Sequence, residues 1–365
     1  MALNTLFLAI SGHGLGHAGQ IAPVVGELRR RQPDLRLVIR SAIRRDALEG
    51  LFGTDFVLLE GAPEPSIRMH GPLDLDIQGT LEAYTAYHDS FHAHISQEIA
   101  HIQASGADVV LTDIAYTPIR AARKLGIPCI ALCSLNWADV LAHYMLPAQP
   151  RLSALVDEIR SCYAEATRFI APAPSMRMDG LSNLEYVGPI ARRANVDPYI
   201  ARTKLKSRPG ISLVLITMGG VPECCRSKGY PSAKEIHWIV PDDGVSRRRT
   251  DVTPASETGL DFIDILAASD VVVTKPGYGT FLEATRHGVP VAYVERPDWP
   301  ESYYLERWIS RNGVAARIER DRYEKFDYLE VIEKLLFAPT RGPCRFLGAQ
   351  QAARKIFSAC CEIYN

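Results

Sequence analysis

The sequence predicts an α/β protein of two Rossmann-like domains, each built on a parallel sheet covered by helices. Three observations support this prediction. Short apolar runs alternate with amphipathic stretches in the first half of the chain, the same alternation resumes after residue 208, and a stretch rich in Pro, Gly and Asn lies between them. With 365 residues, the chain is long enough to form a hydrophobic core in each half.

The elements of the first half follow the order strand, turn, helix, strand. Residues 5–10 form an apolar run, residues 21–32 have apolar positions at helical spacing, and residues 35–41 form a second apolar run. The pattern recurs as a strand over 107–113, a helix over 117–126 and a buried strand over 127–135. A helix is also predicted over 73–102.

The second half repeats this order. Strands are predicted at 211–216, 270–274 and 289–295, with a helix over 280–288. Residues 346–363 read as a terminal helix. We therefore predict an N-terminal domain over 1–187, a linker over 188–208, a C-terminal domain over 209–344 and a final segment, 345–365, that packs back on the first domain. The crossing at Val187-Gly188-Pro189 is where we expect a cleft between the domains to open.

Composition excludes several classes of protein. Basic and acidic side chains number 41 and 42, so no excess of positive charge indicates nucleic-acid binding. The apolar stretch Leu6 to Ile10 is far shorter than the roughly 20 residues needed to span a bilayer. The eight cysteines form no CxxC pair, which favours a reducing cytoplasm as the location.

The turn after the first strand, Ser11 to His17, combines three glycines with two histidines. At the start of a helix, its amides would face the crevice at the end of a parallel sheet, and Gly14 and Gly16 would let a ligand approach the backbone. A neutral imidazole can accept a proton from a hydroxyl, so His17 is the first candidate for a general base and His13 the second. The alternative is that the glycines only permit tight packing and the histidines cap the helix.

The same turn contains a GxGxxG pattern, which raises the possibility of a dinucleotide-binding domain. That motif calls for an acidic residue at the end of the second strand, where this sequence has Arg40 and Ser41. Arg40, Arg44 and Arg45 could instead bind the 2′-phosphate of NADP, although arginines after a strand more often lie on a solvated face.

A second glycine-rich turn precedes the helix predicted over 280–288, and there a helix N-terminus would be offered to a pyrophosphate. Glu283 is expected on the first helical turn, where its carboxylate could accept both ribose hydroxyls or simply oppose the helix dipole. A further turn after the strand over 211–216 would face the same crevice. The candidate donor-binding residues of these turns are Thr217, Gly219, Gly220, Lys275, Gly277, Tyr278, Gly279, Thr280 and Glu283.

Three other residues stand at strand ends of the first half. Asp113 could orient His17 or an acceptor, or could cap the next helix. Asn136 and Trp137 could line an acceptor pocket. His88 and His92 share a helical face without the carboxylate of an HExxH motif, so no metal ligands are predicted.

At these residues the sequence resembles GT-B glycosyltransferases, in particular the group that holds the bacterial lipid-linked N-acetylglucosaminyltransferase of peptidoglycan synthesis. It is most similar to the N-terminal glycosyltransferase-like region of plant L-arabinokinases. The resemblance lies in SGHGLGHAGQ, in DVVLTD through the segment that ends in LAHY, in VGP, and in the block from DILAASD to RPDWPE.

The resemblance implies a GT-B fold, with an acceptor domain facing a donor domain across a cleft. The donor would be a nucleotide sugar, most often UDP-linked, used without a cofactor or an obligatory metal and with inversion. His17 matches the histidine of the family's N-terminal turn, Gly219 and Gly220 the first donor loop, and Glu283 the ribose-binding Glu. Gly277, Gly279 and Thr280 match the diphosphate loop.

The sequence departs from this family where a pair of Gln, or Asp-Gln, would read the sugar hydroxyls. Arg296-Pro-Asp298-Trp-Pro-Glu301 stands there, so Asp298 and Glu301 are the expected substitutes. Two rival functions remain open at this point: a UDP-sugar 2-epimerase, which would need further carboxylates, and a nucleotide-sugar-binding protein without catalysis.

Overall fold

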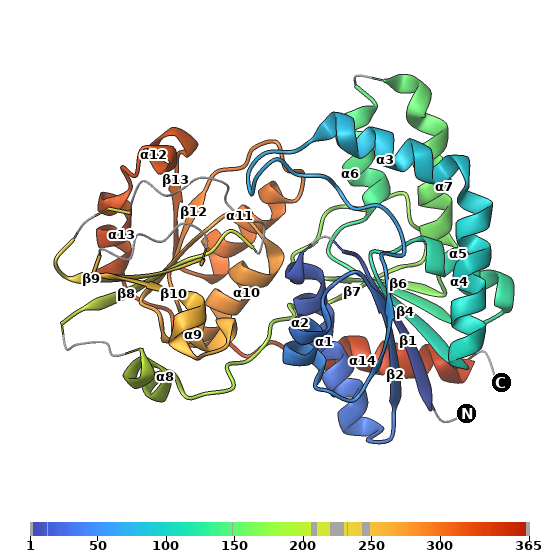
Figure 1. Cartoon of the computed structure of the whole chain (residues 1–365), viewed down its shortest axis with the longest axis horizontal. Coiled ribbons are helices and arrows are strands. Elements are labelled where there is room, and N and C mark those ends of the chain that lie inside the picture. Colours follow the sequence, from blue (N-terminus) through green and yellow to red (C-terminus); the bar gives the residue numbers. More distant parts are fainter. Residues whose placement is uncertain are drawn as a thin grey trace. The chain divides into compact units, whose positions relative to one another are not determined.

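The computed structural model describes residues 3–12, 14–147, 149–205, 210–219, 230–231, 233–242 and 249–362. The chain divides into two compact units. Unit 1 comprises Met1–Met69, Leu75–Ile190 and Phe346–Asn365, and unit 2 comprises His70–Asp74 and Ala191–Arg345. Both are α/β, and Figure 1 shows a sheet with helices in each.

The sheet of unit 1 has seven parallel strands in the order β3-β2-β1-β4-β5-β6-β7. Ile10 at the end of β1 pairs in register with Asp113 at the end of β4. The chain adds strands on one side of β1 and then on the other, so β1 and β4 flank the point where the strand order reverses. The strands are β1 (Thr5–Ile10), β2 (Arg36–Ser41), β3 (Val57–Glu60), β4 (Val109–Asp113), β5 (Cys129–Leu132), β6 (Arg168–Pro172) and β7 (Leu184–Val187).

Two groups of helices accompany this sheet. The helices α1 and α14 pack against each other and share one hydrophobic core with alternate residues of the strands, such as Leu6 and Leu8. The helices α3 to α7 contact one another and form the second group. The bounds are α1 (Leu15–Arg31), α2 (Arg45–Phe52), α3 (Ile77–Asp89), α4 (Phe91–Ser105), α5 (Thr117–Leu125), α6 (Trp137–Met145), η1 (Pro150–Leu152), α7 (Ser153–Ala164) and α14 (Gly348–Glu362).

The last helix, α14, belongs to unit 1 although the sequence places it after unit 2. Ala352, Ala353, Ile356 and Ala359 are fully buried in the core beside α1, and the two helices lie side by side in Figure 1. At its start, the Gly348 amide donates to the Pro189 carbonyl at 3.2 Å. Unit 1 is therefore completed by the final segment of the chain.

Unit 2 has six parallel strands in the order β10-β9-β8-β11-β12-β13. The order reverses between β8 and β11, where Ile216 pairs in register with Val273. Trp238 and Tyr328 are fully buried in its core. The strands are β8 (Ser212–Ile216), β9 (Ile236–Val240), β10 (Val252–Pro254), β11 (Val271–Thr274), β12 (Val291–Val294) and β13 (Ala315–Ile318).

The helices of unit 2 connect these strands. The longest of them, α11, follows β12, and α10 links β11 to β12. Their bounds are α8 (Pro198–Lys204), η2 (Ala255–Thr258), α9 (Phe262–Ala268), α10 (Tyr278–His287), α11 (Ser302–Asn312), α12 (Arg320–Glu324) and α13 (Leu329–Leu336).

Two expectations differ from the observed elements. Of the linker expected over 188–208, residues 191–205 are part of unit 2, where α8 packs on α9 and Arg202 binds Asp270 at 2.8 Å. The single helix expected over 73–102 is two helices, α3 and α4, that meet at Ser90. Periodicity predicts the apolar face of each helix but not the change of direction between them.

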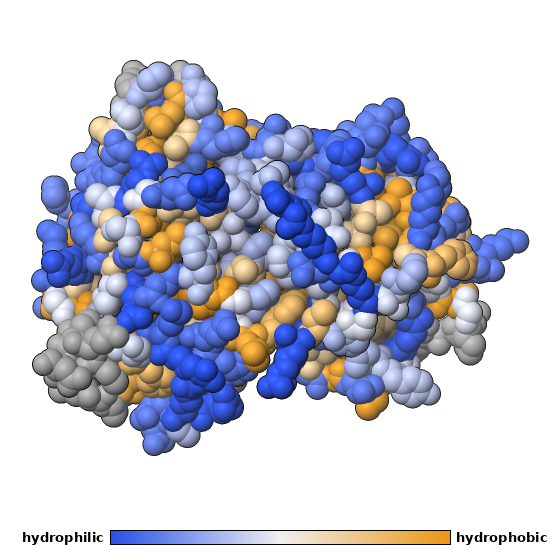
Figure 2. Space-filling model, turned by 180° about the vertical axis from the view of Figure 1, so that it is seen from behind, coloured by the Kyte–Doolittle hydropathy of each residue, from blue (hydrophilic) through white to orange (hydrophobic). Residues whose placement is uncertain are grey.

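In the part of the chain that the structure describes, no helix combines the length and the apolar character needed to cross a bilayer. Figure 2 shows hydrophilic side chains over most of the visible face, with apolar ones in scattered patches. Exposed apolar side chains are usual on protein surfaces.

Candidate functional site

The end of β1 and the start of α1 place His17 at the point where the strand order of unit 1 reverses. Gly14 precedes α1 with a φ of 72°, a left-handed conformation that glycine adopts without strain. The helix begins at Leu15, so His17 lies on its first turn. Gly16 has open space around it, since an added Cβ would meet no atom within 4 Å.

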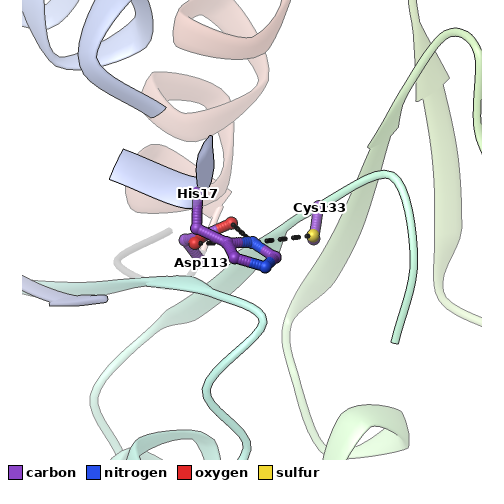
Figure 3. A group of neighbouring side chains, drawn as sticks. All are labelled: His17, Asp113 and Cys133. Carbon is purple, nitrogen blue, oxygen red and sulfur yellow. Dashed lines mark hydrogen bonds and ion pairs between the residues drawn. The ribbon is translucent and has the colours of Figure 1, made fainter. Parts of the chain in front are cut away.

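His17 and Asp113 form a pair, as Figure 3 shows. His17 Nδ1 lies 3.1 Å from Asp113 Oδ2 and 3.3 Å from Oδ1. The Asp113 side chain is fully buried, and that of His17 is 13% exposed. Each of these side chains is directed at the other. A neutral His17 that donates its Nδ1 proton to Asp113 carries its lone pair on Nε2, on the far side of the ring.

The backbone directly after Asp113 is strained. Ile114 has a φ of 59°, which is rare for a β-branched residue and costs roughly 1–2 kcal/mol. Its carbonyl accepts a hydrogen bond from the buried hydroxyl of Tyr163. Strain of this kind persists where surrounding contacts enforce it. Here the strained backbone lies directly after Asp113, the residue that contacts His17.

The two residues expected to line an acceptor pocket are buried. Asn136 is 1% exposed and caps α6, accepting from the Asp139 amide at 2.9 Å. Trp137 is fully buried, with its ring 5.7 Å from that of His17 in an edge-on arrangement. The Asn136 side chain therefore caps the helix, and the Trp137 ring packs edge-on against the ring of His17. Only sequence position suggested a pocket there, and it carries no information on burial.

Glu64 is a buried acid in this region that no sequence motif indicates. It is 2% exposed, and its Oε2 accepts from the Tyr116 amide at 3.1 Å. Burial raises the pKa of Glu64 well above its usual range, and the charges of Glu98 and Asp113 act in the same direction. Glu64 comes from an irregular segment, where no pattern in the sequence signals burial.

In unit 2, two turns flank the reversal of strand order. The turn after β8 carries Thr217, which is buried, and Gly219, which has a φ of 75°. The turn after β11 begins with Lys275, whose Cε would lie 3.4 Å from a Cβ added at Gly219. The two turns therefore meet at the carboxyl edge of the sheet, the position where open α/β sheets bind ligands.

The glycines at the start of α10 leave space. Gly277 and Gly279 both have ordinary backbone angles, so conformation does not require glycine at either. An added Cβ would meet nothing within 4 Å at Gly279 and only the Lys275 carbonyl, at 3.8 Å, at Gly277. Tyr278, the first residue of the helix, is buried, whereas Thr280 is half-buried. The amides of this first turn are positioned as in an anion site.

Glu283 differs from its expected position. Since α10 begins at Tyr278, Glu283 lies on the second turn rather than the first. It is 2% exposed and forms a two-pronged ion pair with Arg192, in which Nη2 lies 3.1 Å from Oε2 and Nε donates to Oε1. Each carboxylate oxygen keeps a second lone pair. Arg192 follows the crossing segment and was not singled out from the sequence.

The segment after β12 brings cations and an acid to the same turns. Burial lowers the pKa of Lys275 to about 7, and the charge of Arg296 adds to this effect against that of Glu301. The Arg296 guanidinium stacks on Trp299 at 4.4 Å, and the Trp299 Nε1–H donates to Glu301 at 3.3 Å. Of the two predicted sugar-binding acids, Glu301 is buried beside this group and Asp298 is exposed.

The arginines that would bind a 2′-phosphate are engaged elsewhere. Arg40 is 5% exposed, pairs with Glu98 at 3.0 Å and donates to the carbonyls of Glu60 and Gly61. Arg44 pairs with Asp46 and Arg45 with Glu49 on the surface. Each arginine of this cluster therefore pairs with an acidic side chain of the protein itself.

A separate basic basin lies in unit 2, with a volume of about 500 Å³ and Arg193, Arg286 and Arg345 in its lining. Arg286 is near the C-terminal end of α10, so the helix, about 15 Å long, separates this basin from the glycine turn. Burial and the two neighbouring arginines lower the pKa of Arg286.

Among the described residues, one group of three side chains has the donor atoms and spacing for a metal ion: His17, Asp113 and Cys133. His88, which sequence spacing had raised, is instead bonded to Glu158 and Tyr116. The predicted site residues His13 and Gly220 lie outside the described residues.

Comparison with known proteins identifies the fold. No family model matches the chain. The structure is similar to the calicheamicin glycosyltransferase CalG4, with a TM-score of 0.59 and 15% identity over 100% of this chain and 95% of that one. It is likewise similar to UGT89C1 of Arabidopsis thaliana, solved with UDP, with a TM-score of 0.61 and 14% identity over 98% and 99% of the two chains. The two parallel sheets are those of the GT-B glycosyltransferase fold.

Two further likenesses bear on this result. The spinosyn rhamnosyltransferase SpnG, solved with thymidine diphosphate, has a TM-score of 0.59 and 12% identity over 98% of this chain and 96% of that one. L-arabinokinase of Arabidopsis thaliana is 23% identical over 323 residues, 82% of this chain. The chain spans only 29% of the length of that protein, so the similarity is distant and covers part of the relative.

Proposed function

We propose that this protein is a glycosyltransferase that moves a hexosyl group from a nucleotide sugar, a UDP-sugar, to an acceptor hydroxyl. The observation that carries the proposal is the pair of His17 Nδ1 and the buried Asp113 carboxylate, 3.1 Å apart at the strand-order reversal of unit 1. A histidine held by a carboxylate in this way can accept the proton that an acceptor hydroxyl must lose as it attacks. The GT-B fold supplies the context.

In the proposed mechanism, His17 Nε2 accepts the acceptor's proton while the acceptor oxygen attacks the anomeric carbon. Asp113 fixes the ring and stabilises the imidazolium that forms. The bond from the anomeric carbon to the diphosphate breaks in the same displacement, so the sugar is transferred with inversion and without a required metal. The departing nucleoside diphosphate takes the negative charge.

The donor half of the proposal rests on unit 2. Amides at the start of α10 and the Lys275 ammonium would bind the diphosphate, while the open space at Gly277 and Gly279 admits it. Glu283, held by Arg192, would accept hydrogen bonds from the ribose hydroxyls through its remaining lone pairs. Glu301 and Arg296 would lie near the sugar.

Replacement of His17 by Ala tests the catalytic half. Nucleotide release from a panel of UDP- and TDP-sugars with candidate hydroxyl acceptors should fall by about 10²- to 10⁴-fold, the usual contribution of a general base. UDP affinity, measured by calorimetry, should change less than twofold. The exposed His143 on α6 provides a matched control, and His143→Ala should retain full transfer.

Asp113→Asn should also lose most of the transfer rate, because an amide favours the wrong tautomer of His17 and cannot stabilise its charge. Equal transfer by wild type and both variants would contradict the mechanism. A wild-type protein that binds UDP-sugars but transfers to no acceptor would support the non-catalytic alternative, and epimerised free donor in the absence of an acceptor would support an epimerase.

A further inference from the structure

The three side chains around His17 come from three different elements of unit 1. His17 is on the first turn of α1, Asp113 ends β4 and Cys133 follows β5 directly. Figure 3 shows the Asp113 carboxylate and the Cys133 sulfur on either side of His17 Nδ1, with dashed lines from both that meet at this nitrogen. Cys133 Sγ lies 3.8 Å from that nitrogen, and all three donor atoms lie within 4.8 Å of one another.

These distances fit a tetrahedral zinc site. With bonds of roughly 2.0–2.2 Å to nitrogen and oxygen and about 2.3 Å to sulfur, the donor atoms of such a site are about 3.4–3.6 Å apart. Two of the observed separations, 3.1 Å between nitrogen and oxygen and 3.8 Å between nitrogen and sulfur, differ from these by a few tenths of an ångström, and the third, between oxygen and sulfur, is at most 4.8 Å. Side-chain rotations that bring the oxygen and the sulfur closer together would place one ion between the three atoms.

Burial and charge favour a cation at this point. Asp113 is fully buried, Cys133 is 1% exposed, and a carboxylate removed from water requires a positive partner. Asp113 Oδ2 has no hydrogen bond in suitable geometry among the described residues, although Nδ1 is 3.1 Å away. One nitrogen, one oxygen and one thiolate sulfur form a donor set that suits zinc and related d-block ions better than magnesium or calcium.

We propose that His17, Asp113 and Cys133 bind one thiophilic divalent ion of the zinc class, which switches off His17. A metal on Nδ1 forces the ring proton onto Nε2, and Nε2 then has no lone pair for an acceptor proton. The fourth ligand is water, admitted where the His17 side chain reaches solvent. The binding claim stands on the geometry alone, and only the inhibition rests on the proposed function.

The proton balance of binding is defined. The thiol of Cys133 loses one proton to the buffer as its thiolate joins the metal. The proton on His17 Nδ1 is replaced by the metal, and one proton is gained at Nε2, so the histidine contributes no net release. Binding should therefore release about one proton per ion, and affinity should rise with pH.

A Co²⁺ titration tests the binding, because a cobalt-thiolate bond produces a charge-transfer absorption that oxygen and nitrogen ligands do not. The full-length protein should bind one equivalent with this band, and Zn²⁺ should displace it. Cys133→Ser should lose the band and at least about tenfold in Zn²⁺ affinity. The buried Cys129 on β5 is the matched control, and Cys129→Ser should retain both.

Several outcomes would overturn the proposal. A charge-transfer band unchanged in Cys133→Ser would place the metal on another cysteine, and the absence of the band in wild type would exclude a thiolate site. Thermal unfolding without metal shows whether each variant is folded. If Cys133→Ser is unfolded, Asp113→Asn takes its place in the titration and should keep the band with a lower Zn²⁺ affinity.

Transfer assays separate this proposal from the proposed function. Zn²⁺ should inhibit wild type and lose its effect in Cys133→Ser, and a chelator should restore rather than abolish transfer. If the protein binds Co²⁺ through Cys133 but transfers no sugar, the metal site stands and the function fails. If it transfers sugar and Zn²⁺ has no effect, the function stands and the metal switch fails.

Discussion

At the scale of single residues, Lys275 would make binding at the proposed donor site depend on pH. Burial and the neighbouring Arg296 hold the pKa of Lys275 at about 7 in the free protein. A bound diphosphate favours the charged ammonium, so its pKa is higher in the complex. Between about pH 7 and that higher pKa, binding of the donor should therefore be coupled to the uptake of a proton.

UDP-sugar affinity should accordingly be constant below pH 7 and fall by up to tenfold per pH unit above it. Calorimetry between pH 6 and 9 measures this, and a UDP-sugar is preferred to UDP because its diphosphate does not titrate in that range. Lys275→Gln should bind more weakly with a flat profile, whereas Lys234→Gln, at an exposed position, should behave as wild type. Parallel profiles for the two variants would exclude a role for Lys275.

Glu64 supplies a second pH effect, on stability. Its pKa in the folded protein is far above that in the unfolded chain, so its contribution to stability is complete below about pH 4.3 and is lost as the pH rises. Glu64→Gln removes this loss and keeps an acceptor for the Tyr116 amide. From pH 5 to 8, the free energy of unfolding should fall more steeply in wild type than in the variant, by up to about 1.4 kcal/mol per pH unit. Urea unfolding at several pH values measures the two slopes, and identical slopes would show that Glu64 ionises normally.

Some candidate site residues could be predicted from the sequence and others could not. His17 and Asp113 could, because they stand at turns next to strands, where sequence patterns indicate a site. Cys133 and Arg192 acquire their roles from contacts across 116 and 91 positions of the sequence, respectively. Such contacts depend on strand order and register, which no local pattern specifies.

At the scale of elements, apolar runs predicted the strands β1, β2, β4, β5, β8, β11 and β12, whereas the other strands gave no such signal. The packing of the final segment on the first domain was predicted, but the close approach of α14 to the segment after β7 was not. A Cβ at Gly348 would lie 2.0 Å from the Gly188 carbonyl and 2.5 Å from that of Pro189.

Gly348→Ala should therefore destabilise unit 1 by several kcal/mol, since backbone atoms rather than a flexible side chain block the methyl group. Gly26→Ala, inside α1 and with no atom within 4 Å of the new Cβ, should stabilise the protein by about 0.5–1 kcal/mol. Thermal and urea unfolding of both variants provide the comparison. A neutral effect at Gly348 would mean that the start of α14 adjusts freely.

At the scale of the whole molecule, the two units have the same plan, and each reverses its strand order where the candidate residues lie. Hydrogen exchange of the intact protein can show which of the two units binds the nucleotide. UDP should slow exchange at residues 217–219 and 277–283 and leave α13 (Leu329–Leu336) unchanged. Protection by NADP at the turn before α1 would instead favour the dinucleotide hypothesis.

The return of α14 to unit 1 has a consequence for biosynthesis. Chains emerge from the ribosome N-terminus first, and domains generally fold as units as they emerge. The core of unit 1 lacks Ala352, Ala353, Ile356 and Ala359 until the helix that carries them has been made, whereas unit 2 is complete at Arg345. We therefore expect unit 2 to reach its native state on the ribosome before unit 1. The unit that appears first in the sequence would be the last to fold, and its apolar surface beside α1 would be the part of the nascent chain exposed longest to chaperones.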